Sequence, residues 1–188
     1  MIIWIASYPK SGNTYLRSFL SAYYFSKNGK FNFDLLLNIP QFPNMKFSKT
    51  KIDTKEEASK KWIYNQNIFF NKNKINFIKT HNCLSKYNGN EFTSKQETLG
   101  VIYIVRDPRN IITSLTNHYS ISYDEALKYM LDDNSSLLEK SYDQDYSNFT
   151  YLNSWSNHYK SWKNNSKFKI LFIKYEDLED NRNEIFSK

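Results

Sequence analysis

The hydrophobic residues of this chain form short runs that alternate with stripes at helical spacing. Runs dominated by apolar residues occupy positions 2–6, 75–79, 101–105 and 169–173. Short runs of this kind, rich in isoleucine, valine and aromatic residues, are typical of strands in a buried parallel sheet. The pattern therefore predicts four strands.

The segments between these strands carry the signals of helices. Apolar residues at spacings of three and four predict a helix over residues 14–25 and another over 150–163. Thr54 and Ser122 each precede a glutamate by three residues, which is the capping-box pattern that begins a helix. Asp107, followed directly by a proline, is a further helix cap.

Strands that alternate with helices predict an α/β fold, a three-layer α/β/α arrangement with a central parallel sheet. In such sheets, ligands bind beyond the carboxyl ends of the strands. Residues 8–14, 80–81, 106 and 175 follow the predicted strands, so we expect them along one edge. Residues 27–51 are weakly patterned and are predicted as loops. No repeat or linker divides the chain.

Composition places the chain among single globular domains. It has 188 residues, of which 40% are hydrophobic and 18% aromatic, enough to build a core. The net charge of +7 favours anionic partners such as nucleotides, acidic glycans, nucleic acid or a membrane surface. A lysine-rich solvated surface explains the same charge equally well.

The single cysteine, Cys83, rules out an internal disulfide and is compatible with a reducing compartment. We interpret it as a core thiol and not as a nucleophile. The apolar run at residues 2–6 is too short to span a bilayer, and no basic region precedes it. We therefore expect a cytoplasmic protein without stable membrane insertion.

The first loop has the composition of an anion site. It leads from a strand into a helix, whose first-turn amides have no partner within the helix and carry partial positive charge. Gly12 allows close approach to the backbone, Lys10 adds a charge, and Ser11 and Thr14 add hydroxyls. Asn13 stands where a triphosphate-binding loop has its lysine, so a kinase or GTPase is disfavoured.

His81 follows the second predicted strand and is a candidate general base for an acceptor hydroxyl. A structural or surface role is the alternative. No second histidine or carboxylate accompanies it at metal-ligand spacing, so we expect no metal. No Gly-x-Ser-x-Gly segment occurs, and a Ser-His-Asp hydrolase is unsupported.

Arg106 and Ser114 form a second candidate anion site. Arg106 leaves the third predicted strand, and Ser114 lies two helical turns after the cap at Asp107. A guanidinium fork and a hydroxyl can hold one phosphate together. In the alternative, Arg106 forms a structural ion pair with Asp107 or Glu176.

These segments together resemble the sulfotransferases that use 3′-phosphoadenosine 5′-phosphosulfate (PAPS). The sequence SYPKSGNTY at residues 7–15 resembles their 5′-phosphosulfate loop, and KTH at 79–81 resembles the segment with their catalytic histidine. Residues 103–114 are similar to their 3′-phosphate segment, and 175–178 resemble a further signature. The resemblance implies a P-loop NTPase-like fold and the transfer of a sulfuryl group to a hydroxyl or amine, without a metal.

The resemblance also implies a role for each matching residue. Lys10, His81 and Lys79 would be catalytic, with Lys10 at the bridging oxygen, His81 as the base and Lys79 at the sulfuryl group. Arg106 and Ser114 would hold the 3′-phosphate. The remaining residues would bind the 5′-phosphate through loop amides and the Thr14 hydroxyl, or contact the adenine through aromatic rings: Ser11, Gly12, Asn13 and Thr14 for the phosphate, Tyr15 and Tyr175 for the adenine.

Asn13 replaces the threonine common in many relatives, and a larger departure from the family pattern concerns the end of the chain. Relatives continue well beyond the position of Tyr175 to an Arg-Lys-Gly segment, which this chain lacks. Residues 1–188 are thus expected to form a single sulfotransferase domain without the family's C-terminal part. The alternatives are an inactive truncated relative and a small-molecule kinase. A nucleic-acid-binding module lacks a recognition signature here, so no nucleic-acid partner is expected.

The sequence does not distinguish a small molecule, a lipid or a glycan as the acceptor. It also does not indicate the oligomeric state. Residues 27–73 and 120–149 are expected to shape the acceptor pocket. Their aromatic residues would suit a phenol, a steroid, a lipid or a sugar: Phe42, Phe47, Tyr123 and Tyr142.

Overall fold

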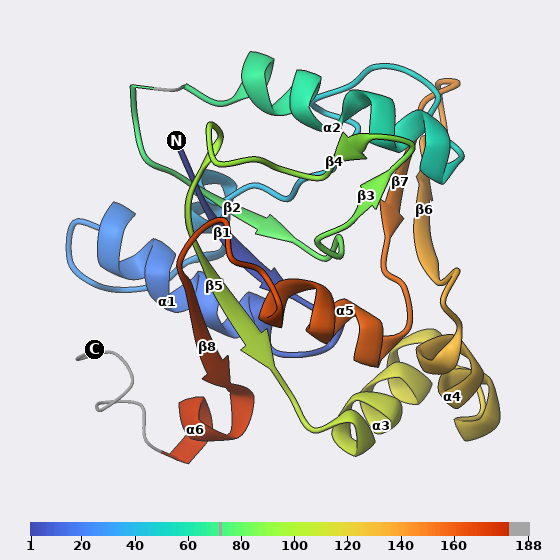
Figure 1. The fold of residues 1–188 in the computed structure, drawn as a ribbon. Helices are drawn as coiled ribbons and strands as arrows, with labels where there is room; N and C mark the ends of the chain where they lie inside the picture. Colours follow the sequence, from blue (N-terminus) through green and yellow to red (C-terminus); the bar gives the residue numbers. More distant parts are fainter. Residues whose placement is uncertain (72, 181–188) are drawn as a thin grey trace.

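The computed structural model describes residues 1–71 and 73–180 and has a four-stranded parallel sheet at its centre (Figure 1). The strand order is β2–β1–β5–β8. The strands are β1 (Ile2–Ser7), β2 (Asn76–Thr80), β5 (Thr98–Val105) and β8 (Ile170–Lys174). All four strands that the apolar runs predict are present, and the predicted sheet is confirmed.

The register of the sheet brings the strand ends together. Ala6 of β1 pairs with Thr80 of β2 on one side and with Tyr103 of β5 on the other. Val105 pairs with Lys174 at the end of β8. The carboxyl ends of all four strands therefore meet at one edge of the sheet, where ligands bind in folds of this kind.

Six α-helices and one 3₁₀-helix accompany the sheet in the described part of the chain. They are α1 (Asn13–Phe25), η1 (Phe33–Asn38), α2 (Lys55–Phe69), α3 (Pro108–Tyr119), α4 (Tyr123–Leu131), α5 (Trp155–Lys163) and α6 (Tyr175–Asp180). Both predicted capping boxes are present, at Thr54 and Ser122, and Asp107 caps α3. Any continuation of α6 into residues 181–188 lies outside the described residues.

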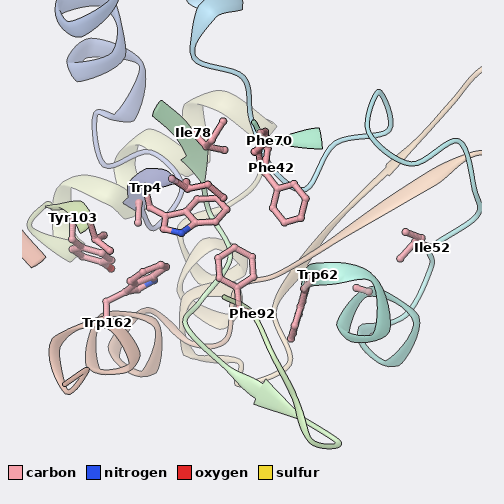
Figure 2. Packing of buried hydrophobic residues seen from close by; sticks show 13 residues of the cluster. Trp4, Phe42, Ile52, Trp62, Phe70, Ile78, Phe92, Tyr103 and Trp162 are labelled. Carbon is pink, nitrogen blue, oxygen red and sulfur yellow. The ribbon is translucent and has the colours of Figure 1, made fainter. Parts of the chain in front are cut away.

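The larger core lies on the sheet face that α2 and α5 cover, and Figure 2 shows its aromatic centre. Phe92 lies in the middle of this cluster, with ring centroids 5.2 Å from Trp4, 5.7 Å from Trp62 and 6.3 Å from Trp162. The Trp4 indole donates to Thr98 Oγ1 at 2.9 Å, which satisfies its buried polar atom.

The opposite face of the sheet carries α1, η1 and α6. Ile5 and Ile104 point to this side and pack with Leu16 of α1 and Leu178 of α6. Helices on both faces give the predicted three layers. The outer part of the α1 stripe is exposed, because Tyr23 keeps 71% of its surface. A third cluster joins α3 and α4 to Tyr8 at the sheet edge.

Two hairpins extend the fold beyond the sheet. They are β3 (Lys86–Tyr87) with β4 (Asn90–Glu91), and β6 (Ser136–Lys140) with β7 (Ser147–Tyr151). The helix predicted for residues 150–163 is wrong at its start. Thr150 and Tyr151 pair with β6, and Asn153 has a φ of 66°, so α5 begins only after Ser154.

The segment predicted as loops before α2 adds to the outer edge of β2. Gln41 forms an isolated parallel bridge with Lys79, and the amide of Phe42 donates to the Lys79 carbonyl at 2.8 Å. This pairing places Gln41 beside the carboxyl end of β2. Within residues 1–71 and 73–180, no helix is both long enough and apolar enough to cross a membrane.

Candidate functional site

A cavity of about 500 Å³ opens at the carboxyl ends of β1, β2 and β5. It collects residues from the β1–α1 loop, from the end of β2, from the β5–α3 turn and from β6. The described residues that line it are Pro9, Lys10, Gly12, Asn13, Thr14, Gln41, Lys79, His81, Arg106, Ser114, His118, Tyr119, Leu137 and Glu139. Most of the residues that the sequence marks as candidates thus lie around one space.

The β1–α1 loop presents an uncapped helix end to this cavity. Lys10 and Gly12 both have positive φ angles, of 67° and 91°, so the chain turns sharply before α1. Gly12 is the N-cap residue and no side chain caps the helix. The amides of the first helical turn therefore remain suited to an anion. The Ser11 hydroxyl is buried without a hydrogen-bond partner among the described residues.

Asn13 stabilises the loop through its side chain. Its Nδ2 donates to the Ile5 carbonyl at 2.9 Å and to Ser7 Oγ at 3.1 Å. The amide group thus ties the start of α1 back to β1. Because this group is turned toward the strand, it does not replace the lysine that a triphosphate-binding loop needs at this position.

Arg106 is fixed between the loop and Tyr175. Its Nη1 donates to the Lys10 carbonyl at 2.9 Å, and its guanidinium carbon lies 4.3 Å from the centre of the Tyr175 ring. Its Nε is buried without a hydrogen-bond partner in the part of the chain that the structure describes. Ser114 of α3 lines the same cavity, so the two predicted 3′-phosphate ligands border one space.

The alternative ion pairs of Arg106 are absent among the described residues. Asp107 forms its ion pair with the exposed Arg109, and this contact lowers the pKa of Asp107 to about 2. Glu176 accepts a hydrogen bond from the Asp107 amide at 3.1 Å. Both carboxylates are thus engaged elsewhere, and Arg106 keeps donors available for an anion.

His81 has the tautomer of a general base. Its Nδ1 lies 2.7 Å from the Ser7 carbonyl oxygen, which can only accept, so Nδ1 carries the hydrogen and Nε2 keeps a lone pair. Burial lowers the pKa of His81 well below its usual range, and the charge of Lys79 lowers it further. The imidazole is therefore neutral at physiological pH.

His158 holds the backbone of His81 and was missed by the sequence reasoning. This fully buried imidazole donates from Nε2 to the His81 carbonyl at 3.0 Å, and its Nδ1 accepts from the Tyr103 hydroxyl at 2.8 Å. Burial lowers the pKa of His158 to about 4. A polar residue in the stripe of Trp155 and Trp162 is the signal that could have identified it.

Lys79 belongs to a chain of side chains that crosses the cavity wall. Its ammonium donates to Gln41 Oε1 at 2.8 Å, and Gln41 Nε2 donates to Glu139 Oε1 at 3.4 Å. The pKa of Lys79 falls to about 8: burial lowers it most, the charges of Arg17 and Lys10 also lower it, and Glu139 partly opposes them. Local sequence patterns could not identify Gln41 and Glu139, because both lie in weakly patterned segments.

Three of the predicted ligands lie outside the cavity lining. Ser11 is buried beneath the loop, whereas Tyr15 and Tyr175 pack against the cluster around Ile5. The Tyr175 ring lies against Gly12, where an added Cβ would be 2.2 Å from the ring. Tyr175 therefore packs directly against the loop, and Tyr15 belongs to the same hydrophobic cluster.

The aromatic residues expected in the acceptor pocket are elsewhere. Phe42 is 1% exposed in the core and Phe47 packs against that core, whereas Tyr123 and Tyr142 are exposed on the surface. The two segments named for this pocket do contribute to the cavity, but through Gln41, Leu137 and Glu139. The four aromatic side chains named for this pocket are thus absent from the cavity lining, since the exposure of a side chain depends on tertiary packing.

The electrostatics of the cavity favour an anion. Lys10, Lys79 and Arg106 all line it, and burial together with the neighbouring Arg106 lowers the pKa of Lys10. Within the described residues, no three His, Cys, Asp or Glu side chains are grouped so that they could hold a metal ion. Cys83 is buried away from the lining, and burial raises its pKa to about 12.

The fold and this site define a P-loop-like α/β protein with an uncapped loop suited to an anion after its first strand and a neutral histidine at the end of a neighbouring strand. A comparison with protein families matches residues 2–186 to the sulfotransferase domain. The chain therefore belongs to the sulfotransferase domain family.

Comparisons with individual proteins bear on the fold of the chain. A search of curated proteins gives no match. Among solved structures, the chain is similar to retinol dehydratase crystallised in a complex with retinol and PAP, with a TM-score of 0.56 and 16% identity. The alignment covers 99% of this chain and 57% of that chain. At this identity the likeness shows the shared α/β fold alone.

Proposed function

We propose that this protein is a sulfotransferase that moves a sulfuryl group from PAPS to a hydroxyl or amine acceptor, and that residues 1–188 act as one domain. The observation that carries the proposal is the convergence of Lys10, Lys79, Arg106 and neutral His81 on one cavity beside an uncapped helix end. Family membership and the PAP bound to the structurally similar retinol dehydratase support it.

The residues fit the charges of PAPS. The α1 amides and Thr14 would hold the 5′-phosphate, with Ser11 and Asn13 shaping the loop around it. Arg106 and Ser114 would hold the 3′-phosphate, and the buried Nε of Arg106 that lacks a partner supports this assignment. Tyr15 and Tyr175 would contact the adenine from beside the loop, because aromatic rings stack on bases.

The chemistry proposed for the cavity is an in-line transfer. The acceptor oxygen forms a bond to sulfur while the bond between sulfur and the bridging oxygen breaks, and the electron pair stays on the phosphate that is released. His81 Nε2 takes the acceptor proton. Lys10 stabilises the negative charge that develops on the bridging oxygen, and Lys79 stabilises the sulfuryl oxygens.

Nucleotide binding tests the proposal. We expect PAP to raise the melting temperature, because a ligand at one hundred times its Kd stabilises a protein by about 2.7 kcal/mol. ATP with Mg²⁺ and oligonucleotides should give no shift. Arg106→Ala should lose the PAP shift, whereas Arg109→Ala should keep it, because Arg109 is exposed and paired with Asp107.

A transfer assay tests the role of the base. His81→Ala should bind PAP like the wild type yet lose about 10²- to 10⁴-fold in turnover, the range typical of general bases. Stabilisation by ATP with Mg²⁺ but not by PAP would refute the proposal. PAP binding without transfer to any hydroxyl or amine acceptor would assign the chain to the inactive relatives.

A further inference from the structure

Part of the cavity wall has no role in the proposed binding of PAPS. It is formed by Gln41 beside β2, by His118 and Tyr119 at the end of α3, and by Leu137 and Glu139 of β6. Four of these five side chains are polar or amphipathic, and no phenylalanine or tryptophan of the described chain joins them. The wall therefore suits a polar acceptor better than a flat apolar one.

Glu139 is the distinctive group of this wall. It is partly buried, and it forms no ion pair within residues 1–71 and 73–180. Its Oε1 accepts a hydrogen bond from Gln41, whose other amide atom binds the Lys79 ammonium. One amide group thus separates this carboxylate from the lysine that we assign to the sulfuryl oxygens, which places Glu139 close to the reacting centre.

The charge of Glu139 needs a partner once PAPS is present. A phosphate monoester alone carries about −1.5 to −2 charges at pH 7, and the phosphosulfate adds further negative charge. This charge would engage Lys10, Lys79 and Arg106, so the negative charge of PAPS would offset the favourable interaction of Glu139 with Lys79. A partly buried carboxylate without a counter-charge is unfavourable, and a cation on the acceptor would compensate it.

Tyr119 is a second residue of this wall that favours a cation on the acceptor. Tyr119 lines the cavity, and burial together with the negative charge of Glu139 raises the pKa of its hydroxyl. The ring and the carboxylate therefore face a common space. Aromatic faces attract cations, so a carboxylate beside such a ring is a suitable site for an ammonium group.

We propose that Glu139 binds a protonated amine of the acceptor, and that the preferred acceptor is an amino alcohol or amino sugar whose hydroxyl is sulfated. Gln41 aligns the carboxylate with Lys79, and the ring of Tyr119 completes the ammonium site. This inference rests on the proposed function, because it names the acceptor class of the same cavity.

Matched acceptors test the inference. With PAPS as donor, glucosamine is compared with glucose and ethanolamine with ethylene glycol, each by kcat/KM. We expect the amines to be preferred about ten- to hundredfold, the range of a hydrogen bond to a charged group. Glu139→Gln should reduce this preference to about one. Glu56→Gln is the control, since Glu56 is exposed on α2 and paired with Lys60.

A binding measurement separates this inference from the proposed function. Ligand-observed NMR with the PAP complex and with the free protein reports amine binding whether or not transfer occurs. Binding of glucosamine that Glu139→Gln abolishes supports the ammonium site, even if PAP does not bind. Equal binding of glucosamine and glucose, or an amine preference retained in Glu139→Gln, overturns it. If the wild-type protein does not bind PAP, the proposed function is refuted but the ammonium site is not.

Discussion

At the scale of single residues, the neighbours of each ionisable group set its chemistry. Lys79 is buried and feels the positive charges of Arg17 and Lys10, and its pKa falls to about 8. His81 donates to the Ser7 carbonyl, and its pKa falls well below 6.5 because it is buried. The proposed base, His81, is thus available as a neutral group, and Lys79 keeps its charge through neutral pH.

These two shifts predict the pH profile of transfer. A lysine with a lowered pKa loses its charge as the pH rises through about 8, so kcat/KM should fall by up to about tenfold per pH unit above that value. Protonation of His81 should not limit the rate until well below pH 6.5. Stopped assays across pH 5 to 10 measure the fall of kcat/KM on the alkaline side and on the acidic side of the profile.

Lys79→Arg provides the control for this profile. Arginine stays charged at every pH of the assay, so the alkaline limb should move to higher pH even if the maximal rate is lower. A limb that stays near pH 8 in this variant would assign the titration to another group.

At the scale of elements, the β1–α1 turn depends on a residue without a side chain. Gly12 has a φ of 91°, and the Tyr175 ring at the start of α6 occupies the space where a Cβ would lie. Tyr175 in turn stacks against Arg106 at the end of β5. One glycine therefore allows three separate elements to meet beside the cavity.

Gly12→Ala is expected to destabilise the protein by more than the backbone strain alone. The left-handed backbone conformation costs a residue with a Cβ about 1–2 kcal/mol. The Tyr175 ring must also move to make room for the added methyl group. Gly29→Ala is the matched control, because Gly29 has a φ of 70° with open space around it. Urea unfolding gives both free energies.

A double substitution tests the steric part of this prediction. In Gly12→Ala/Tyr175→Ala, the ring that blocks the added methyl group is gone, so the combined loss should be smaller than the sum of the single losses. Additive losses would show that Tyr175 does not restrict position 12. Equal losses for Gly12→Ala and Gly29→Ala would lead to the same conclusion.

At the scale of the whole molecule, the packing of α5 against the sheet buries an ionisable group deep in the protein. His158 lies between Tyr103 of β5 and the backbone of His81, and its pKa falls to about 4. The folded protein therefore binds a proton at His158 less readily than the unfolded chain does. The contribution of the neutral His158 to the free energy of unfolding is fully present above pH 6.5, and it is lost as the pH falls toward 4.

This linkage predicts acid-sensitive folding. A shift from 6.5 to about 4 corresponds to a loss of about 3 kcal/mol at most, measured as the free energy of unfolding between pH 7 and pH 4. His158→Gln should be less stable at pH 7, because a buried ring is lost, yet its stability should change less over the same pH range. An unchanged pH dependence in this variant would contradict the assignment.

Much of the fold was predictable because its signals are local. Apolar runs and capping boxes depend on neighbouring residues, so the four strands and the beginnings of α2, α3 and α4 follow from short stretches. The β6–β7 hairpin was missed because Thr150 and Tyr151, which precede a helical stripe in the sequence, pair with Leu137 and Ser136 of β6. Such pairing overrides a local helical pattern.

The amino-acid sequence by itself determined the four strands of the central sheet, the composition that suits the first loop to an anion, and the resemblance to the family to which the chain belongs. These properties reside in contiguous segments such as residues 7–15, whose backbone geometry follows from local composition. Only the tertiary structure decided that Gln41 and Glu139 extend from Lys79 across the cavity wall and that His158 holds His81. The reason is physical: a side chain's partners depend on which distant segments the parallel sheet brings to its edge.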